Sequence, residues 1–173
     1  FMVVATQNPI EMEGTYPLPE AQRDRFMTRI TMGYPSRDSE LEMLERHGAH
    51  NPLDELYPVT HGERITELID VVGSVYVADV VKDYLVNIVA ATRSHDAVRL
   101  GASPRASLHL IRTARAKAAL AGRDYVIPDD VQAMAIPVLA HRLLPSTRAQ
   151  LDGISPVDIV SQILTSTPVP EQA

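Results

Sequence analysis

The sequence contains no cysteine, so it offers neither a disulfide framework nor thiol chemistry. No apolar run approaches the roughly 20 residues that a membrane-spanning helix needs, which predicts no membrane insertion. The formal net charge is -6 and no basic tract is present, so nucleic acid is not an expected partner. No basic region precedes the first apolar residues, so we expect no signal peptide and a cytoplasmic protein.

Motifs for metal binding, covalent catalysis and nucleotide binding are also absent. The six histidines form no HExxH pair or other ligand pattern, so no metal site is expected. No GxSxG nucleophile motif occurs. The P-loop motif GxxxxGK[ST], which cradles a triphosphate, is missing as well.

The beginning of the chain has the pattern of an α/β fold. Residues 1–6 form a continuous apolar run, which predicts a strand of a parallel sheet that is covered on both faces. Pro19 predicts a short helix over residues 19–26, and the alternating residues 27–32 predict a second strand. Buried strands need neighbours to pair with, so we expect the chain to be the C-terminal portion of a larger protein. We therefore expect residues 1–32 to be poorly ordered or to pair with another copy.

The rest of the chain is predicted to be helical. A boundary is expected near residues 33–36, followed by a helix over 37–47 with Leu41 and Leu44 facing inward, and then an irregular connector to residue 60. Apolar residues then recur at three- and four-residue steps, which is typical of amphipathic helices. The first predicted helix starts at a Thr60–Glu63 capping box, and the second covers 77–89. After a loop over 95–102, a third runs from Pro104 to Ala121. A fourth starts at Pro128 with a kink or break at Pro137, and a last one covers 156–165. These helices predict a small bundle.

Arg105 is the most informative single residue of the bundle. It follows Ser103 and Pro104, so it lies in the first turn of its predicted helix, where the helix dipole disfavours a cation. An arginine beside free backbone amides forms an anion site. The alternatives are an exposed arginine or an ion pair with Asp96.

Two further places near the beginning of the chain could bind phosphate. Arg23, Arg25 and Arg29 carry planar guanidinium groups that suit phosphate recognition, although the pattern alone favours a charged helix face that pairs with Glu20 and Asp24. Asn8 follows the first predicted strand, where ligands bind in open α/β sheets, although the pattern alone favours a turn-forming role.

Several segments together resemble the MoxR family of AAA+ ATPases, in the family's order and over nearly the whole chain. The segments that carry this resemblance are Val3–Pro9, Glu13–Gln22, Asp24-Arg25-Phe26, Ala90–Arg93, Gly101–Arg105, Pro137–Leu139 with His141–Leu143, and Thr167–Pro170. The block from Gly14 to Phe26 is specific, whereas the shorter segments would be weak alone.

The resemblance implies roles for three residues. Asn8 matches sensor 1, which positions the attacking water. Arg25 matches the arginine finger, which reaches the nucleotide of a neighbouring subunit, although Arg23 stands where the family has an apolar residue. Arg105 matches sensor 2, which contacts nucleotide from the lid. All three roles suit phosphoryl transfer, in which the protein mainly positions groups and neutralises charge.

The resemblance also implies a mostly α fold: a helical-bundle AAA+ lid preceded by the last strands and the arginine-finger helix of an α/β P-loop NTPase core. The domains would then be the distal core (1–35), a connector (36–60) and the lid (61–173). The parent protein would hydrolyse ATP with Mg²⁺, whereas this chain alone should be inactive and hold no tightly bound cofactor. Expected partners are other subunits of a hexameric ring and client proteins with von Willebrand factor A domains, which the ATPase would mature or activate as a chaperone.

Two alternatives are open at this point. One is a free-standing helical protein-interaction module, in which Arg25 and Arg105 are dispensable. The other is the lid of a related AAA+ ATPase of the metal-chelatase or DNA-remodelling type. The acidic balance weakens the DNA-remodelling version, and the Pro17–Gln22 block favours the MoxR branch.

Overall fold

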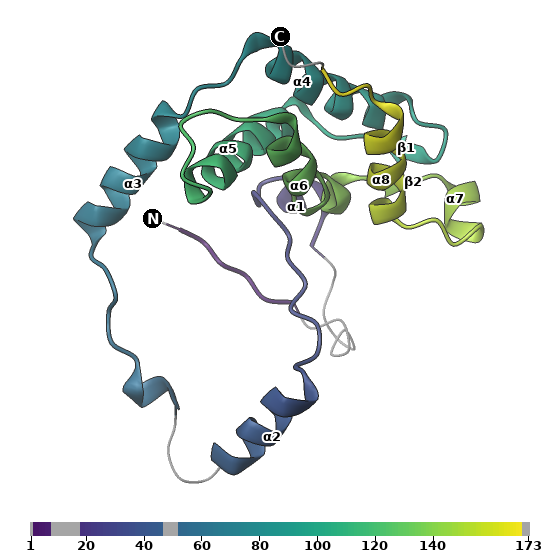
Figure 1. Cartoon of the computed structure of the whole chain (residues 1–173). Helices are drawn as coiled ribbons and strands as arrows, with labels where there is room; N and C mark the ends of the chain where they lie inside the picture. The colour runs from purple at the N-terminus through teal and green to yellow at the C-terminus, as the bar shows by residue number, and fades with distance from the viewer. Residues whose placement is uncertain (1, 8–17, 47–51, 171–173) are drawn as a thin grey trace.

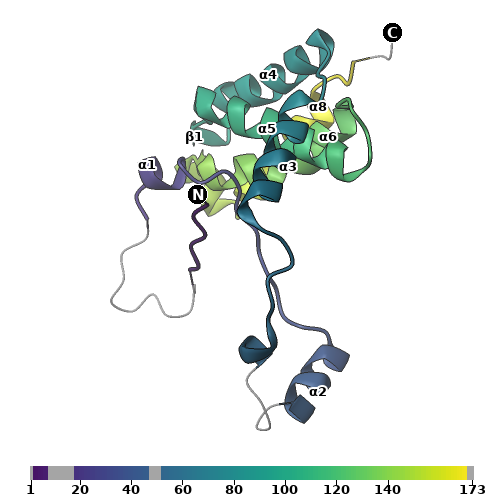
Figure 2. The same cartoon turned by 90° about the vertical axis from the view of Figure 1, so that its left-hand side faces the viewer.

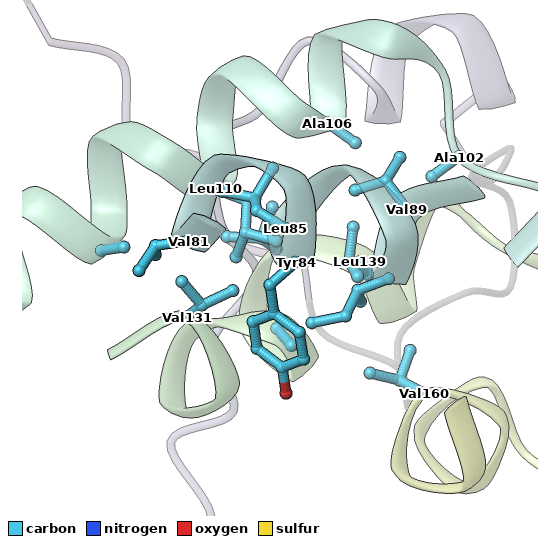
Figure 3. Packing of buried hydrophobic residues seen from close by; sticks show 14 of the residues in the cluster. Val81, Tyr84, Leu85, Val89, Ala102, Ala106, Leu110, Val131, Leu139 and Val160 are labelled. Carbon is cyan, nitrogen blue, oxygen red and sulfur yellow. The ribbon is translucent and has the colours of Figure 1, made fainter. Parts of the chain in front are cut away.

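Helices of the C-terminal two thirds enclose the hydrophobic core. The computed structural model describes residues 2–7, 18–46 and 52–170. The core lies between α4 (Asp79–Ser94), α5 (Pro104–Leu120), α6 (Pro128–Leu139) and α8 (Pro156–Ser166), which form the bundle of Figure 1. Ile88, Leu110 and Ile159 are completely buried in it. Figure 3 shows Tyr84 of α4 reaching towards α6, and its hydroxyl accepts a hydrogen bond of 2.9 Å from Gln132.

The ends of these helices follow the local sequence. Pro104 is the first residue of α5, and Gly122 lies just beyond its end with φ +72°, where glycine carries no steric penalty. Ser155 caps α8, because its hydroxyl accepts from the amide of Asp158 while the Asp158 carboxylate accepts from the amide of Ser155. These predicted helices are therefore confirmed. Pro137 does not break α6, which continues to Leu139.

Short elements close one end of the bundle. The strand β1 (Val98–Leu100) pairs antiparallel with β2 (Leu144–Pro145). β1 lies within the segment 95–102, which was predicted to be a loop. The 3-10 helix η2 (Ala140–Arg142) follows α6 directly, and α7 (Thr147–Leu151) follows β2. The sequence pattern missed these elements because each is too short to show a period. They bring the residues after α6 close to the turn that precedes α5.

The N-terminal elements lie mostly outside the bundle. They are α1 (Glu20–Arg23), α2 (Arg37–Arg46), the 3-10 helix η1 (Pro52–Glu55) and α3 (Gly62–Ser74). Both views show α2 far from the bundle, at the end of long connecting segments (Figures 1 and 2). In contrast, α1 contacts η2, and α3 contacts α5.

Several predictions for this region are wrong. Residues 2–6 and 27–32 form no strand, because no described strand lies beside them to pair with their backbone groups. The helix predicted over 37–47 is present, but Leu41 and Leu44 are exposed. The residue before α3 is His61 rather than Thr60, and no side chain caps that helix. The segment 24–29 contacts the bundle, because the amide of Arg29 donates to the carbonyl of Pro137 at 2.9 Å.

Candidate functional site

One carboxylate joins the N-terminal segment to the start of α5. Asp24 accepts hydrogen bonds from the Ser103 hydroxyl at 3.1 Å and from Arg105 Nη1 at 3.1 Å. It also accepts from Arg142 Nε at 3.2 Å. Its side chain is 23% exposed, whereas that of Arg105 is 50% exposed and that of Arg142 only 1%. Two arginines therefore share a single carboxylate, which leaves a net positive charge.

Arg142 is the buried centre of this group. Besides Asp24 Oδ1, its guanidinium donates to the backbone carbonyls of Asp24 at 3.2 Å and Met27 at 3.3 Å. It also donates to the carbonyls of Phe26 and Val138. A buried cation is costly unless it is paired and its donors are satisfied. The carboxylate and the carbonyls of the N-terminal segment meet this requirement.

Two neutral histidines complete the surroundings of Arg142. His109 Nδ1 lies 2.6 Å from Arg142 Nη2, and His141 Nε2 lies 2.8 Å from Nη1. A guanidinium can only donate, so each of these ring nitrogens is an acceptor. Burial, reinforced by the charge of Arg142, lowers the pKa of His141 to about 4 and also lowers that of His109. Both imidazoles are therefore neutral near pH 7.

The turn before α5 is fixed by contacts with the end of α4. The amide of Ala102 donates to Thr92 Oγ1 at 3.0 Å, and Arg93 Nε donates to the carbonyl of Ala102 at 2.9 Å. A Cβ at Gly101 would stand 2.6 Å from the carbonyl oxygen of Thr92, so only glycine fits there. These contacts set where Ser103 and Arg105 enter α5.

The predicted site residues have different positions in this arrangement. Asn8 lies outside the described residues. Arg105 lies in the first turn of α5 as predicted, but its ion-pair partner is Asp24 and not Asp96. Arg25 is exposed, and within the described ranges its side chain has no hydrogen-bond or ion-pair partner. Arg23 is half-buried, and its Nε is buried without a partner.

Sequence reasoning did not assign a role to Arg142, His109 or His141. Arg142 and Asp24 are 118 residues apart, and no spacing rule connects such distant positions. The signal that was available is the His141-Arg142 pair close after Pro137, where a helix was expected to end.

Neither a metal-binding cluster nor a membrane-spanning helix occurs in the described part of the chain. No group of three or more His, Asp or Glu side chains there could hold a metal ion. No helix in residues 2–7, 18–46 or 52–170 has the length and apolarity that crossing a membrane requires.

Comparison with known proteins agrees with this geometry. The family model of the AAA lid domain matches residues 90–163, and that of the ATPase family associated with various cellular activities (AAA) matches residues 1–28. The chaperone MoxR1 of Mycobacterium tuberculosis is 42% identical over 180 residues, covering 99% of this chain and 47% of MoxR1. The chain belongs to the MoxR family of AAA+ ATPases. Its fold is accordingly that of a MoxR-type helical lid preceded by a fragment of the ATPase core.

Other relatives extend the same likeness. The uncharacterised protein YeaC of Bacillus subtilis is 46% identical over 172 residues, covering 99% of this chain and 54% of YeaC. The crystal structure of a proposed ATPase from Cytophaga hutchinsonii has a TM-score of 0.87 at 34% identity, covering 95% of this chain and 53% of that one. The MoxR-family chain described here thus spans about half the length of the relatives it matches.

Proposed function

We propose that this chain supplies the lid and the arginine-finger segment of an ATPase that couples ATP hydrolysis to chaperone-like maturation of partner proteins. The observation that carries the proposal is the ion pair between the Asp24 carboxylate and Arg105 at the start of α5. It holds the segment in which Arg25 follows Asp24, and the Arg25 side chain is exposed and has no partner among the described residues. Two exposed arginines, one on the N-terminal segment and one at the start of α5, suit the recognition of phosphate groups. The MoxR1 chaperone gives the family precedent for the proposed activity.

In this proposal, Arg105 is the sensor 2 residue and contacts nucleotide bound to its own subunit. It lies beside the first amides of a 17-residue helix that has no side-chain cap, and the N-terminus of a helix favours anions. Half of the Arg105 side chain is exposed, so a phosphate group can approach it. A phosphate oxygen would then share or replace Asp24 as its partner.

Arg25 is the proposed arginine finger. Its side chain is exposed and has no partner within the described residues, as a group that acts on a neighbouring subunit requires. Asn8 is the proposed sensor 1 residue, on the resemblance of its sequence context alone. The partly buried Arg23 has less freedom to reach another chain than Arg25 has.

ATP fits the donors of Arg105 and α5, whereas Mg²⁺ fits no group of carboxylates in the described residues. The sequence also lacks a P-loop. We therefore place the P-loop and the Mg²⁺ ligands on a part of the parent protein that this chain does not include. The isolated chain would then neither turn over ATP nor bind it tightly.

The proposed partners are other subunits of a hexameric ring and client proteins, including proteins with von Willebrand factor A domains. Arg25 is exposed and has no side-chain partner in residues 2–7, 18–46 and 52–170, which supports a neighbouring subunit as its partner. The proposal keeps the cytoplasmic location and assigns no role to nucleic acid.

The test is ATP turnover by the full-length protein and its Arg25→Ala variant, measured at a concentration where the protein assembles. An arginine finger contributes a factor of about 10³ to 10⁵ in rate, so turnover should collapse while nucleotide binding is retained. Unchanged turnover moves the finger to Arg23, which the Arg23→Ala variant then tests. If both variants are fully active, the ATPase role of this segment is wrong and the interaction-module alternative stands.

A further inference from the structure

We propose that Arg142 is a positioning residue that fixes Arg25 relative to Arg105. The inference rests on the proposed function, because it concerns how the finger segment is held. Arg142 lies 118 residues from Asp24 in the sequence, within the short 3-10 helix η2 of the lid. It would act through the backbone of the finger segment and would not touch nucleotide.

The first argument is where the donors of Arg142 are directed. They reach the backbone carbonyls of Asp24, Phe26 and Met27, which lie on both sides of Arg25. The Arg142 side chain is 1% exposed, so these bonds form away from water, where hydrogen bonds are electrostatically stronger. One rigid, planar group thus holds the backbone before and after Arg25.

The second argument is what Arg142 leaves free. Neither Arg142 nor any other described residue forms a hydrogen bond or ion pair with the Arg25 side chain, which stays exposed. A contact that served only to attach this segment could as well involve the Arg25 guanidinium. Here the backbone is fixed, while the Arg25 guanidinium has no partner in the described part of the chain, which is the arrangement that a group acting on another molecule needs.

The third argument is the shared carboxylate. Asp24 accepts from Arg142 Nε at 3.2 Å and from Arg105 Nη1 at 3.1 Å. The residue next to Arg25 in the chain is therefore bonded to Arg105 as well. Moving the finger segment disturbs Arg105, and drawing Arg105 towards a phosphate withdraws one bond from Asp24. The proposed nucleotide contacts of Arg25 and Arg105 are thus mechanically coupled through Asp24.

A structural reporter tests the positioning without reference to ATP. The amide of Arg29 donates to the carbonyl of Pro137, so its hydrogen exchange reports whether the segment stays on the lid. Arg142→Lys keeps the charge but has three donors in place of the five of arginine. We expect exchange of the Arg29 amide to become about tenfold faster or more, while that of Leu110 in the core stays unchanged.

The matched control is Arg148→Lys, since that side chain is 93% exposed, and it should change neither amide. Unchanged protection of Arg29 in Arg142→Lys would overturn the proposal. If Arg142→Lys does not fold, Arg142→Gln is the second variant, because it removes the buried charge and three of the five donors. Retained protection of Arg29 in Arg142→Gln would then overturn the proposal.

Turnover of the full-length protein tests the functional half. Arg142→Lys should lower kcat by about tenfold or more, with KM nearly unchanged. In the Arg25→Ala/Arg142→Lys double variant the two losses should not multiply, because Arg142 acts in large part through Arg25. Fully multiplicative losses would refute this. If Arg25→Ala alone retains full turnover, the proposed function fails, and the exchange of Arg29 alone decides the positioning.

Discussion

Arg142 shows how a buried cation can be accommodated without a carboxylate of its own. It shares Asp24 with Arg105, and its remaining donors are directed at carbonyls and at two imidazoles. The imidazoles can accept these bonds only while they are neutral. The protonation state of His109 and His141 is therefore part of the structure of this site.

This dependence predicts a loss of stability in mild acid. The pKa of His141 is about 4 in the folded chain, against an ordinary value of 6.5, so the unfolded chain binds the additional proton first. The contribution of His141 is complete above pH 6.5 and is lost as pH falls towards 4. A shift of this size corresponds to on the order of 3 kcal/mol. Urea unfolding of the 173-residue chain at several pH values measures it.

The control for this pH dependence is a histidine outside the site. His141→Gln retains an acceptor for Arg142 but cannot titrate, so the unfolding free energy should fall less between pH 6.5 and 4. His61→Gln, at an exposed position before α3, should behave like the unmodified chain. Equal pH dependence in all three proteins would contradict the assignment.

At the scale of the elements, the turn between α4 and α5 determines where Arg105 stands. Gly101 lies against the last turn of α4, and a Cβ there would stand 2.6 Å from the Thr92 carbonyl oxygen. The neighbouring Ala102 amide is bonded to the Thr92 hydroxyl. A displacement of this turn would therefore move the start of α5 and disturb the ion pair with Asp24.

Gly101→Ala should consequently destabilise the chain by about 1–3 kcal/mol, because backbone atoms have to move to make room. Thermal or urea unfolding measures this change. Gly73→Ala is the matched control: Gly73 lies inside α3, and nothing stands within 4 Å of the added Cβ. That substitution should stabilise slightly or be neutral. Equal effects of the two substitutions would show that the close approach of Gly101 has no energetic consequence.

The elements also show which parts of the fold local sequence can predict. The helices α4, α5 and α8 were predicted because caps, prolines and apolar spacing act within a few residues. Arg105 was placed correctly for the same reason. The strands over 1–6 and 27–32 were wrong, since a strand needs a partner that the local pattern does not supply. Arg142 could not be assigned, because its carboxylate is 118 residues away.

At the scale of the whole molecule, the lid encloses a complete core while the N-terminal elements do not. The completely buried side chains lie on the bundle helices, whereas no residue of α3 is buried. Exposed apolar residues outside the bundle include Met2, Met32, Tyr34, Leu44, Tyr57, Val59 and Ile69. Isolated exposed apolar residues are ordinary, but an amphipathic helix with no buried face is not. Under the proposed function, another part of the parent protein covers them.

The proposed placement of the P-loop on another part of the parent protein predicts that the 173-residue chain does not hydrolyse ATP, although it carries Arg25 and Arg105. Without a P-loop, nothing in the sequence holds the β- and γ-phosphates in place, and positioning supplies most of the rate in phosphoryl transfer. Phosphate release from ATP by the pure chain should equal that of buffer, while the full-length protein turns over. The Arg25→Ala variant of the chain separates a contaminant from true activity. Phosphate release by the chain that this substitution abolishes would show that the chain contains a catalytic site of its own, and would contradict the placement of the P-loop elsewhere.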